Sequence, residues 1–258
     1  MSLLEYFWLA SHQLAVFDGD EIEGWGSGFI LKYKERIFFI TCDHVIHLLD
    51  DYANGERANY DFTPYIITNY SKESDEINTC FMPIGRFNYF DKKDFKIPEL
   101  TDLVDVAFAE MKMTLEAPIW SHALHDYDGK KIVEEKKNKI IIEEDKISEV
   151  SKDKTYVLTG SVENQLVDGI RIDRKNKFVQ DIKYEGGSHF GYIELKTPEP
   201  TSKKEWEGLS GSPVFSEDGK LVGMLNEVVE GENTIHITPI GKITKFIDYV
   251  IATEDNRG

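Results

Sequence analysis

Three residues of types that cooperate in nucleophilic catalysis occur in the chain order His44, Asp105, Ser210, and each adjoins an apolar run. A serine hydroxyl becomes an effective nucleophile when a neutral imidazole takes its proton, and a carboxylate can hold that imidazole in place. Each residue alone has an ordinary explanation, namely a structural histidine, a solvent-facing aspartate and a glycine–serine turn. Their combination predicts a nucleophilic site assembled from distant parts of the chain.

The serine lies in the segment Gly208-Leu209-Ser210-Gly211-Ser212-Pro213-Val214-Phe215, a tight turn just before an apolar strand. Glycine allows positive φ angles and lets another molecule approach the backbone closely. A nucleophilic serine needs such a turn, because its hydroxyl must be exposed and nearby backbone N–H groups must face the developing oxyanion. The pattern Gly-x-Ser-Gly is weak by itself, since glycine–serine turns are common.

The histidine and the aspartate each adjoin a predicted strand. His44 follows the apolar run Phe39–Thr41, and Asp105 lies inside Asp102–Phe108. An ionised carboxylate within an apolar run is costly unless a donor hydrogen-bonds it. We therefore expect Asp105 to accept a hydrogen bond from His44, with Asp102 as the other candidate carboxylate.

The elements that position these residues are mainly short β-strands. Runs of β-branched and aromatic residues alternate with glycine, asparagine and aspartate, which favours antiparallel sheets closed into barrels or sandwiches. The predicted strands are Ser27–Leu31, Arg36–Thr41, Tyr65–Thr68, Val104–Phe108, Thr155–Leu158, Gly191–Leu195, Pro213–Phe215, Leu221–Leu225 and Thr234–Ile237.

Two segments depart from this pattern. Lys130–Lys154 is dense in lysine and glutamate, and we expect it to connect two halves of the molecule, with room for one strand at Ile140–Ile142. Near the C-terminus, apolar residues recur at helical spacing, which predicts a helix packed on the second half. They are Ile243, Phe246, Ile247, Val250 and Ile251. An exposed, partner-binding helix is the alternative.

Together these segments make the sequence similar to the trypsin-like (chymotrypsin-fold) serine peptidases, of the intracellular or bacterial type. The resemblance covers roughly residues 24–247. It is carried by Gly26-Ser27-Gly28-Phe29-Ile30, Ile40-Thr41-Cys42-Asp43-His44-Val45, Asp105-Val106-Ala107-Phe108, Gly208–Val214 and Gly223-Met224-Leu225. It implies an all-β fold of two antiparallel six-stranded barrels with a C-terminal helix. We expect an N-terminal barrel with His44 and Asp105 over residues 1–126, and a C-terminal barrel with Ser210 and the helix over residues 127–258.

The resemblance implies a serine endopeptidase that works through an acyl-enzyme. Ser210 is then the nucleophile, His44 the general base and later the general acid, and Asp105 the residue that orients His44. The backbone N–H groups of Gly208 and Ser210 form the oxyanion hole. The strand made of Leu225, Asn226, Glu227 and Val228 would pair with the substrate backbone. Lys204, six residues before the serine, would line the specificity pocket and favour an acidic side chain, unless it is a solvated loop lysine.

Two departures from the secreted members of this family bear on activation and compartment. Leu209 stands where those members carry an aspartate that pairs with a newly cut N-terminus, so we expect activation without N-terminal cleavage. Cys42 and Cys80 are too few for a disulfide framework. We expect two reduced thiols and a cytoplasmic location, and a single bridge is the alternative. The first residues lack the positive start of a secretory signal.

The composition excludes several classes of protein. The hydrophobic fraction of 41% is too high for a disordered chain. The net charge of −17 repels phosphate backbones and anionic lipid, so we expect neither nucleic acid nor membrane as a partner. No apolar stretch is long enough for a transmembrane helix.

Two other interpretations of the sequence compete with the peptidase. A zinc site could use the His-x-x-His pair His44 and His47 with Asp43 and Asp50, but no further ligand motif follows, so we expect no metal and no cofactor. The other rival is a peptide- or protein-binding module on a peptidase fold, either non-catalytic or activated by a protein partner. The presence of all three triad residue types favours the enzyme, with a protein or peptide as its substrate.

Overall fold

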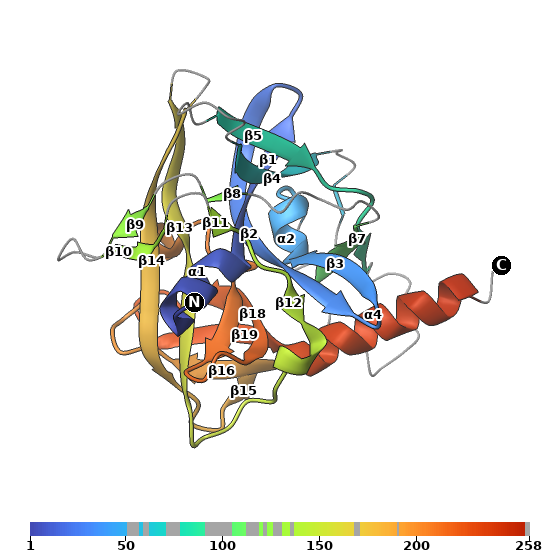
Figure 1. Ribbon diagram of the computed structural model, residues 1–258. Helices are drawn as coiled ribbons and strands as arrows, with labels where there is room; N and C mark the ends of the chain where they lie inside the picture. The colour runs from blue at the N-terminus through green and yellow to red at the C-terminus, as the bar shows by residue number, and fades with distance from the viewer. Residues whose placement is uncertain are drawn as a thin grey trace.

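A computed structural model describes residues 1–50, 57–58, 62–70, 78–90, 105–111, 119–120, 123–125, 131–134, 137–167, 171–189 and 191–255. Most of these residues form β-strands arranged in two large sheets (Figure 1). The strands that were predicted from β-branched and aromatic runs all coincide with or overlap strands in the structure. Local sequence pattern therefore determines much of the secondary structure.

The first sheet is built mainly from the N-terminal half of the chain. Its strands are β1 (Ser11–Asp18), β2 (Glu21–Tyr33), β3 (Arg36–Thr41), β4 (Thr63–Tyr70), β5 (Asn78–Pro83), β6 (Asn88–Tyr89), β7 (Ala107–Glu110), β8 (Ile119–Trp120), β11 (Lys137–Asn138) and β12 (Ile142–Glu143). The order along the sheet is β11-β8-β4-β1-β2-β3-β7-β6, with β5 paired to β4 and β12 paired in parallel to β2. A separate hairpin joins β9 (Leu124–His125) and β10 (Lys131–Val133).

The second sheet closes into a barrel. Its strands are β13 (Thr155–Val167), β14 (Arg171–Lys183), β15 (Ser188–His189), β16 (Tyr192–Lys196), β17 (Pro213–Ser216), β18 (Leu221–Val228) and β19 (Thr234–Pro239). The order is β14-β13-β17-β18-β19-β16-β15, and a pairing of Lys183 with Lys196 joins β14 to β16. This pairing closes a six-stranded ring, which confirms the predicted fold class. Within the described residues the end strands of the first sheet do not pair with each other, so strict closure is seen in the second barrel.

The chain changes sheet later than residue 126, the boundary expected from the sequence. Strands β11 and β12 still pair with the first sheet, through Asn138 with Ile119 and Ile142 with Leu31. The second sheet begins at Thr155. The crossover therefore lies between Glu143 and Thr155, inside the charged segment that was expected to connect the halves.

Five helical segments accompany the sheets in the described part of the chain. They are α1 (Leu3–Ala10), α2 (Asp43–Ile46), the 3₁₀ turn η3 (Glu144–Lys146), α3 (Lys203–Trp206) and α4 (Ile240–Asp255). Helix α1 lies against the second sheet, where the Phe7 ring stacks on Phe215 with centroids 5.2 Å apart. Among the described helices, none combines the length and the apolar character needed to cross a membrane.

The C-terminal helix α4 forms where helical spacing predicted it, but it does not pack on the second half alone. Phe246 stacks on Phe90 and meets Phe108 edge-on, with centroids 3.8 and 4.9 Å apart. Both partners belong to the first half, and Lys34 there pairs with Asp248 at 2.7 Å. The apolar stripe therefore fills a core shared by the two sheets, so the helix packs on the second half as predicted and on the first half as well. Figure 1 shows α4 running alongside both halves. Helical periodicity identifies a buried face but not the surface that covers it.

Candidate active site

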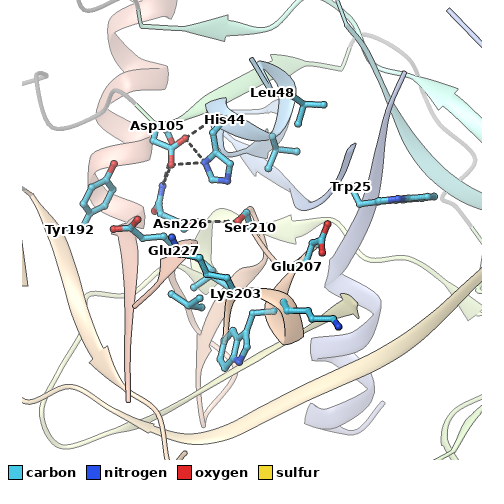
Figure 2. Close-up of a pocket in the computed structure, with 16 residues that line it drawn as sticks. Trp25, His44, Leu48, Asp105, Tyr192, Lys203, Glu207, Ser210, Asn226 and Glu227 are labelled. Carbon is cyan, nitrogen blue, oxygen red and sulfur yellow. Dashed lines mark hydrogen bonds and ion pairs between the residues drawn. The ribbon is translucent and has the colours of Figure 1, made fainter. Parts of the chain in front are cut away.

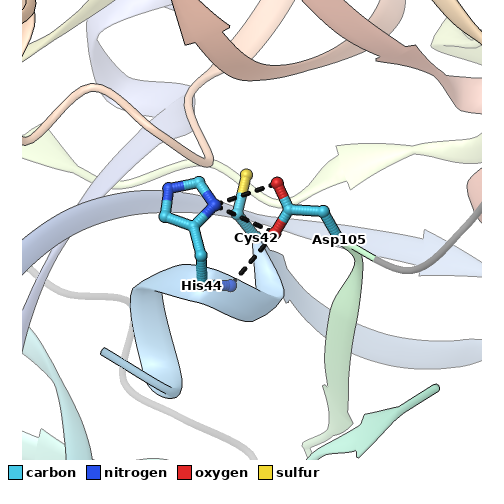
Figure 3. A group of neighbouring side chains, drawn as sticks. All are labelled: Cys42, His44 and Asp105. Atoms are coloured by element: carbon cyan, nitrogen blue, oxygen red, sulfur yellow. Dashed lines mark hydrogen bonds and ion pairs between the residues drawn. The ribbon is translucent and has the colours of Figure 1, made fainter. Parts of the chain in front are cut away.

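His44 and Asp105 are brought together by neighbouring strands. Thr41 at the end of β3 pairs with Ala107 at the start of β7, so the residues just beyond them lie side by side. His44 Nδ1 lies 2.9 Å from both carboxylate oxygens of Asp105, and the His44 backbone N–H donates to Asp105 Oδ1 at 3.0 Å (Figure 3). The hydrogen bond predicted between these residues is therefore present. Asp102, the other candidate carboxylate, lies outside the described residues.

This contact sets the charge preference of both groups. Burial disfavours the imidazolium and lowers the pKa of His44, but the charge and hydrogen bond of Asp105 outweigh burial, so the pKa is raised above its ordinary 6.5. Burial likewise opposes ionisation of Asp105, but His44 reverses the effect and lowers the pKa of that carboxyl. Asp105 is thus an anion that fixes the proton of the imidazole on Nδ1, which leaves Nε2 to act as the base.

The turn that carries Ser210 depends on its glycines. Glu207 has φ −57° and ψ 127°, Gly208 has φ +95°, and the Leu209 N–H donates to the Trp206 carbonyl at 3.0 Å. These are the features of a type II turn, whose third position requires a positive φ and so favours glycine. The sequence pattern around the serine therefore encodes a defined backbone shape.

The backbone N–H groups of Gly208 and Ser210 are available to a ligand. Neither group donates a hydrogen bond to any other residue in the part of the chain that the structure describes. Two N–H groups without an intramolecular acceptor, on residues that line one cavity, suit an anionic oxygen. This arrangement fits the oxyanion hole predicted for these two residues.

Ser27 of β2 fastens the serine turn to the first sheet. Its N–H donates to the Ser210 carbonyl at 2.8 Å, and its hydroxyl donates to the Gly208 carbonyl at 2.7 Å. A Cβ atom on Gly211 would lie 1.9 Å from the Ser27 carbonyl oxygen, so that position requires glycine. The sheet that carries His44 therefore also fixes the backbone around Ser210.

One cavity of about 730 Å³ contains all the predicted site residues in its lining (Figure 2). These residues are His44, Asp105, Lys204, Gly208, Ser210, Leu225, Asn226, Glu227 and Val228. Ser210 Oγ donates to the Asn226 carbonyl at 3.1 Å instead of to His44. The hydroxyl thus lies in the same cavity as the imidazole but points to a different acceptor.

Asn226 links the two halves of the site, a function that the sequence did not reveal. Its Nδ2 donates to Asp105 Oδ2 and to the Asp105 carbonyl, both at 3.1 Å. The buried hydroxyl of Thr238 donates to Asn226 Oδ1 at 2.6 Å and orients the amide. From the sequence, Asn226 was expected only to pair with the substrate through its backbone. The one sequence feature that could have indicated its side-chain contacts is the presence of an amide residue in the mainly apolar strand β18.

Leu209 and Lys204 occupy contrasting environments. Leu209 is fully buried in the core of the second barrel, against a strand where Gly160 leaves space for it. A leucine buried in this way supports the serine turn by packing. Lys204 is exposed on α3 and still lines the cavity.

The His47 region considered as a metal site already holds a cation. Asp43, His47 and Asp50 cluster closely, but the Arg57 guanidinium contacts Asp43 and Asp50 at 2.5 Å each. His47 Nδ1 also lies 2.7 Å from Asp43 Oδ1. The carboxylates are therefore engaged in an ion-pair network that supports α2.

Comparison with solved structures places this geometry in a known fold. The scabies mite inactivated protease paralogue S-D1 is similar with a TM-score of 0.54 and 11% identity, over 96% of this chain and 94% of that one. Human heparin binding protein gives 0.50 and 11%, over 98% and 94%. The serine endoprotease from Yersinia pestis gives 0.52 and 13%, over 97% and 65%.

The chain has the chymotrypsin-like fold of trypsin-like serine proteases. No protein-family model and no curated protein sequence matches it. At identities of 11–13% the similarity concerns the fold. The names of the similar structures include a serine endoprotease, an inactivated paralogue and a heparin binding protein, so the chemistry must be argued from the site itself.

Proposed function

We propose that this protein is a serine endopeptidase that cleaves peptide bonds through the triad His44, Asp105 and Ser210 and an acyl-enzyme intermediate. The observation that carries the proposal is the contact of His44 Nδ1 with both Asp105 oxygens, in the wall of a cavity that Ser210 also lines. The unused N–H groups of Gly208 and Ser210 support it further.

The proposed reaction follows from these groups. Ser210 Oγ attacks the substrate carbonyl carbon while its proton passes to His44 Nε2, and the oxyanion accepts hydrogen bonds from Gly208 and Ser210. His44 then gives the proton to the departing amine. Water, activated by the same histidine, releases the acyl group from Ser210. Asp105 stays ionised throughout and holds the imidazole.

Substrate binding explains how Ser210 Oγ leaves the Asn226 carbonyl. The pairing of β18 with β17 ends at Met224, and the Leu225 carbonyl and N–H still bond Gly211 and Ser212. Beyond Leu225 the strand pairs with β19 along one edge and is open along the other within the described residues. An extended peptide added along the open edge would supply a backbone N–H to the Asn226 carbonyl. The serine hydroxyl, displaced from that acceptor, can then rotate toward His44.

Covalent labelling by a fluorophosphonate tests the enzyme. We expect one adduct on Ser210 and its loss in Ser210→Ala and His44→Ala. The adduct should be retained in the control Ser216→Ala, which changes the serine at the end of β17. In peptide cleavage, Ser210→Ala should lower kcat by on the order of 10⁴ or more. A folded protein that is labelled elsewhere, or cleaves peptides without Ser210, would contradict the proposal.

Lys204 is proposed to bias the substrate toward an acidic side chain before the scissile bond. Its side chain is exposed in the cavity lining and forms no ion pair within the described part of the chain. A digest of an unbiased peptide library measures this bias directly, and Lys204→Glu should reverse it. An unchanged cleavage profile in that variant would assign Lys204 to the solvated surface.

A binding module, or an enzyme switched on by a protein partner, is the second candidate. The observation that favours it is the hydrogen bond of Ser210 Oγ to the Asn226 carbonyl, which directs the hydroxyl away from its base. A folded, unlabelled protein that binds peptides in calorimetry would support the module. Labelling that starts only when a cell extract is added would support partner activation. We place either activity in the cytosol, where thiols such as buried Cys42 stay reduced.

A further inference from the structure

We propose that an apolar wall made of Trp25, Val45 and Leu48 binds a large apolar residue of the substrate on the leaving-group side of the scissile bond. The inference rests on the proposed function, since it assigns a substrate class to the same site. Trp25 comes from β2, Val45 from α2, and Leu48 from the turn that follows α2. All three line the cavity that holds His44 and Ser210.

The position of this wall identifies the part of the substrate that it meets. In acyl transfer the histidine gives its proton to the departing amine, so the leaving group lies on the imidazole side of the serine hydroxyl. Val45 and Leu48 belong to the same short segment as His44. Figure 2 shows Leu48 and Trp25 on one side of the cavity, and Glu227 and Tyr192 on the other.

Two glycines on β2 bring the wall close to the strand. A Cβ atom on Gly24 would lie 2.7 Å from Leu48 Cδ1, and one on Gly26 would lie 2.3 Å from Val45 Cγ1. Val45 is buried, whereas Leu48 and Trp25 are only partly buried. The wall is thus held in place by packing and still presents apolar surface to the cavity.

The chemistry of the wall selects its occupant. Its three side chains carry no charge, whereas the side of the cavity near Tyr192 has Lys203 and Glu227, and the Glu207 carboxylate lies on the Trp25 side (Figure 2). Covering apolar surface with a leucine or phenylalanine side chain is favourable, at about 25 cal/mol per Å². An acidic residue placed there would lose water and face the Glu207 carboxylate. The site therefore prefers Leu, Met or Phe and disfavours Asp and Glu.

Partition of an acyl-enzyme tests this preference separately from acylation. A p-nitrophenyl ester of a blocked peptide acylates Ser210 and releases p-nitrophenol, which contains no amino-acid residue. An added amino-acid amide then competes with water: its amine attacks the acyl carbon, a peptide bond forms, and Ser210 Oγ leaves with the proton from His44. We expect leucinamide and phenylalaninamide to exceed glycinamide by about tenfold as acceptors. Aspartate amide should fall below glycinamide.

Variants of adjacent leucines provide the control. Leu48→Ala should reduce the preference for leucinamide by about threefold or more, since the contact area shrinks. Leu49→Ala should leave the preference unchanged, because Leu49 is 59% exposed and is not part of the described cavity lining. Circular dichroism should match the parent protein in both variants, and the rate of fluorophosphonate labelling should match it in Leu49→Ala.

Each result supports or overturns the inference. Normal acylation with equal acceptance of all amides, or an unchanged preference in Leu48→Ala, overturns the apolar wall and leaves the proposed peptidase intact. Absence of both the acyl-enzyme and the fluorophosphonate adduct in folded protein overturns the proposed function, and the leaving-group assignment with it.

Discussion

The Ser27 hydroxyl donates a 2.7 Å hydrogen bond to the Gly208 carbonyl, from a strand of the first sheet to the serine turn of the second. Both groups are buried, so solvent cannot replace this bond. It fixes the peptide that precedes Leu209, next to a proposed oxyanion donor. The two halves of the molecule are therefore joined at the point where the proposed chemistry needs a rigid backbone.

Removing the Ser27 hydroxyl should slow the reaction of Ser210. Ser27→Ala leaves the Gly208 carbonyl buried without this donor, at a cost of about 1–3 kcal/mol. We expect the fluorophosphonate labelling rate to fall by about tenfold, with an intact circular dichroism spectrum. The control Ser216→Ala loses a hydroxyl that bonds within its own turn, to Asp218 Oδ1 and to Lys220 O, and should label normally. Equal rates in both variants would contradict the structural link.

Gly211 and Gly231 form a matched pair, because both have positive φ angles, +91° and +76°. An alanine at Gly231 has nothing within 4 Å of its Cβ and should cost only the backbone strain of about 1–2 kcal/mol. At Gly211 the Cβ would lie 1.9 Å from the Ser27 carbonyl. Urea unfolding should show a clearly larger loss for Gly211→Ala. Equal losses of unfolding free energy in the two variants would contradict the close contact between Gly211 and the Ser27 carbonyl.

The rate of labelling should depend on pH through His44, whose neutral form is the base. Since Asp105 raises the pKa of His44, the rate should rise with a midpoint above 6.5. Asp105→Asn should lower the His44 midpoint in an NMR titration and reduce kcat by on the order of 10⁴. The free energy of unfolding should change in the opposite direction and fall as pH rises. The ion pair of His44 with Asp105 stabilises the fold fully below the ordinary His44 pKa, provided that Asp105 is ionised. That stability is lost as pH rises through the raised value. An unchanged midpoint in Asp105→Asn would contradict the coupling.

Because Leu209 cannot pair with an N-terminal ammonium group, the reactivity of Ser210 should not depend on a free N-terminus. The side chain is fully buried, and Met1 is 78% exposed at the start of the chain. Adding a tag before Met1 should change the labelling rate of Ser210 by less than about twofold. Leu209→Ala should lose about 2–5 kcal/mol of unfolding free energy, whereas the exposed control Leu49→Ala should lose under about 0.5. Labelling that requires removal of the tag would refute this form of activation.

Sequence predicted the site where local pattern and chemistry coincide. His44 and Asp105 each adjoin an apolar strand, and pairing of β3 with β7 is enough to join them. Asn226 could not be found in this way, because its amide acts across the two halves, on a carboxylate 121 residues away in the sequence. The hydrogen bond of Ser27 to the serine turn was not predicted, for a related reason. Ser27 was recognised only as part of a glycine-rich strand, and its partner lies 181 residues away.

The placement of α4 shows a similar limit. Helical periodicity predicted which face of the helix is buried, but it did not predict that this face also contacts Phe90 and Phe108 of the first half. The crossover segment is another example. Its charges predicted a connection with room for one strand at Ile140–Ile142, and a strand does form there, where Ile142 is fully buried and pairs in parallel with Leu31 of β2. Three isoleucines among lysines and glutamates indicated the strand but not its partner.

The contact of α4 with the first half has a consequence for protein synthesis. Phe90 and Phe108 are translated long before Phe246, so the first half leaves the ribosome without the ring that completes its core. Domains generally fold in order as they emerge, and this one must wait for the helix. We expect a ribosome-stalled chain ending at Pro239 to be readily degraded by added protease and to remain unlabelled at Ser210. A nascent chain would then be unable to cut its neighbours on the same polysome.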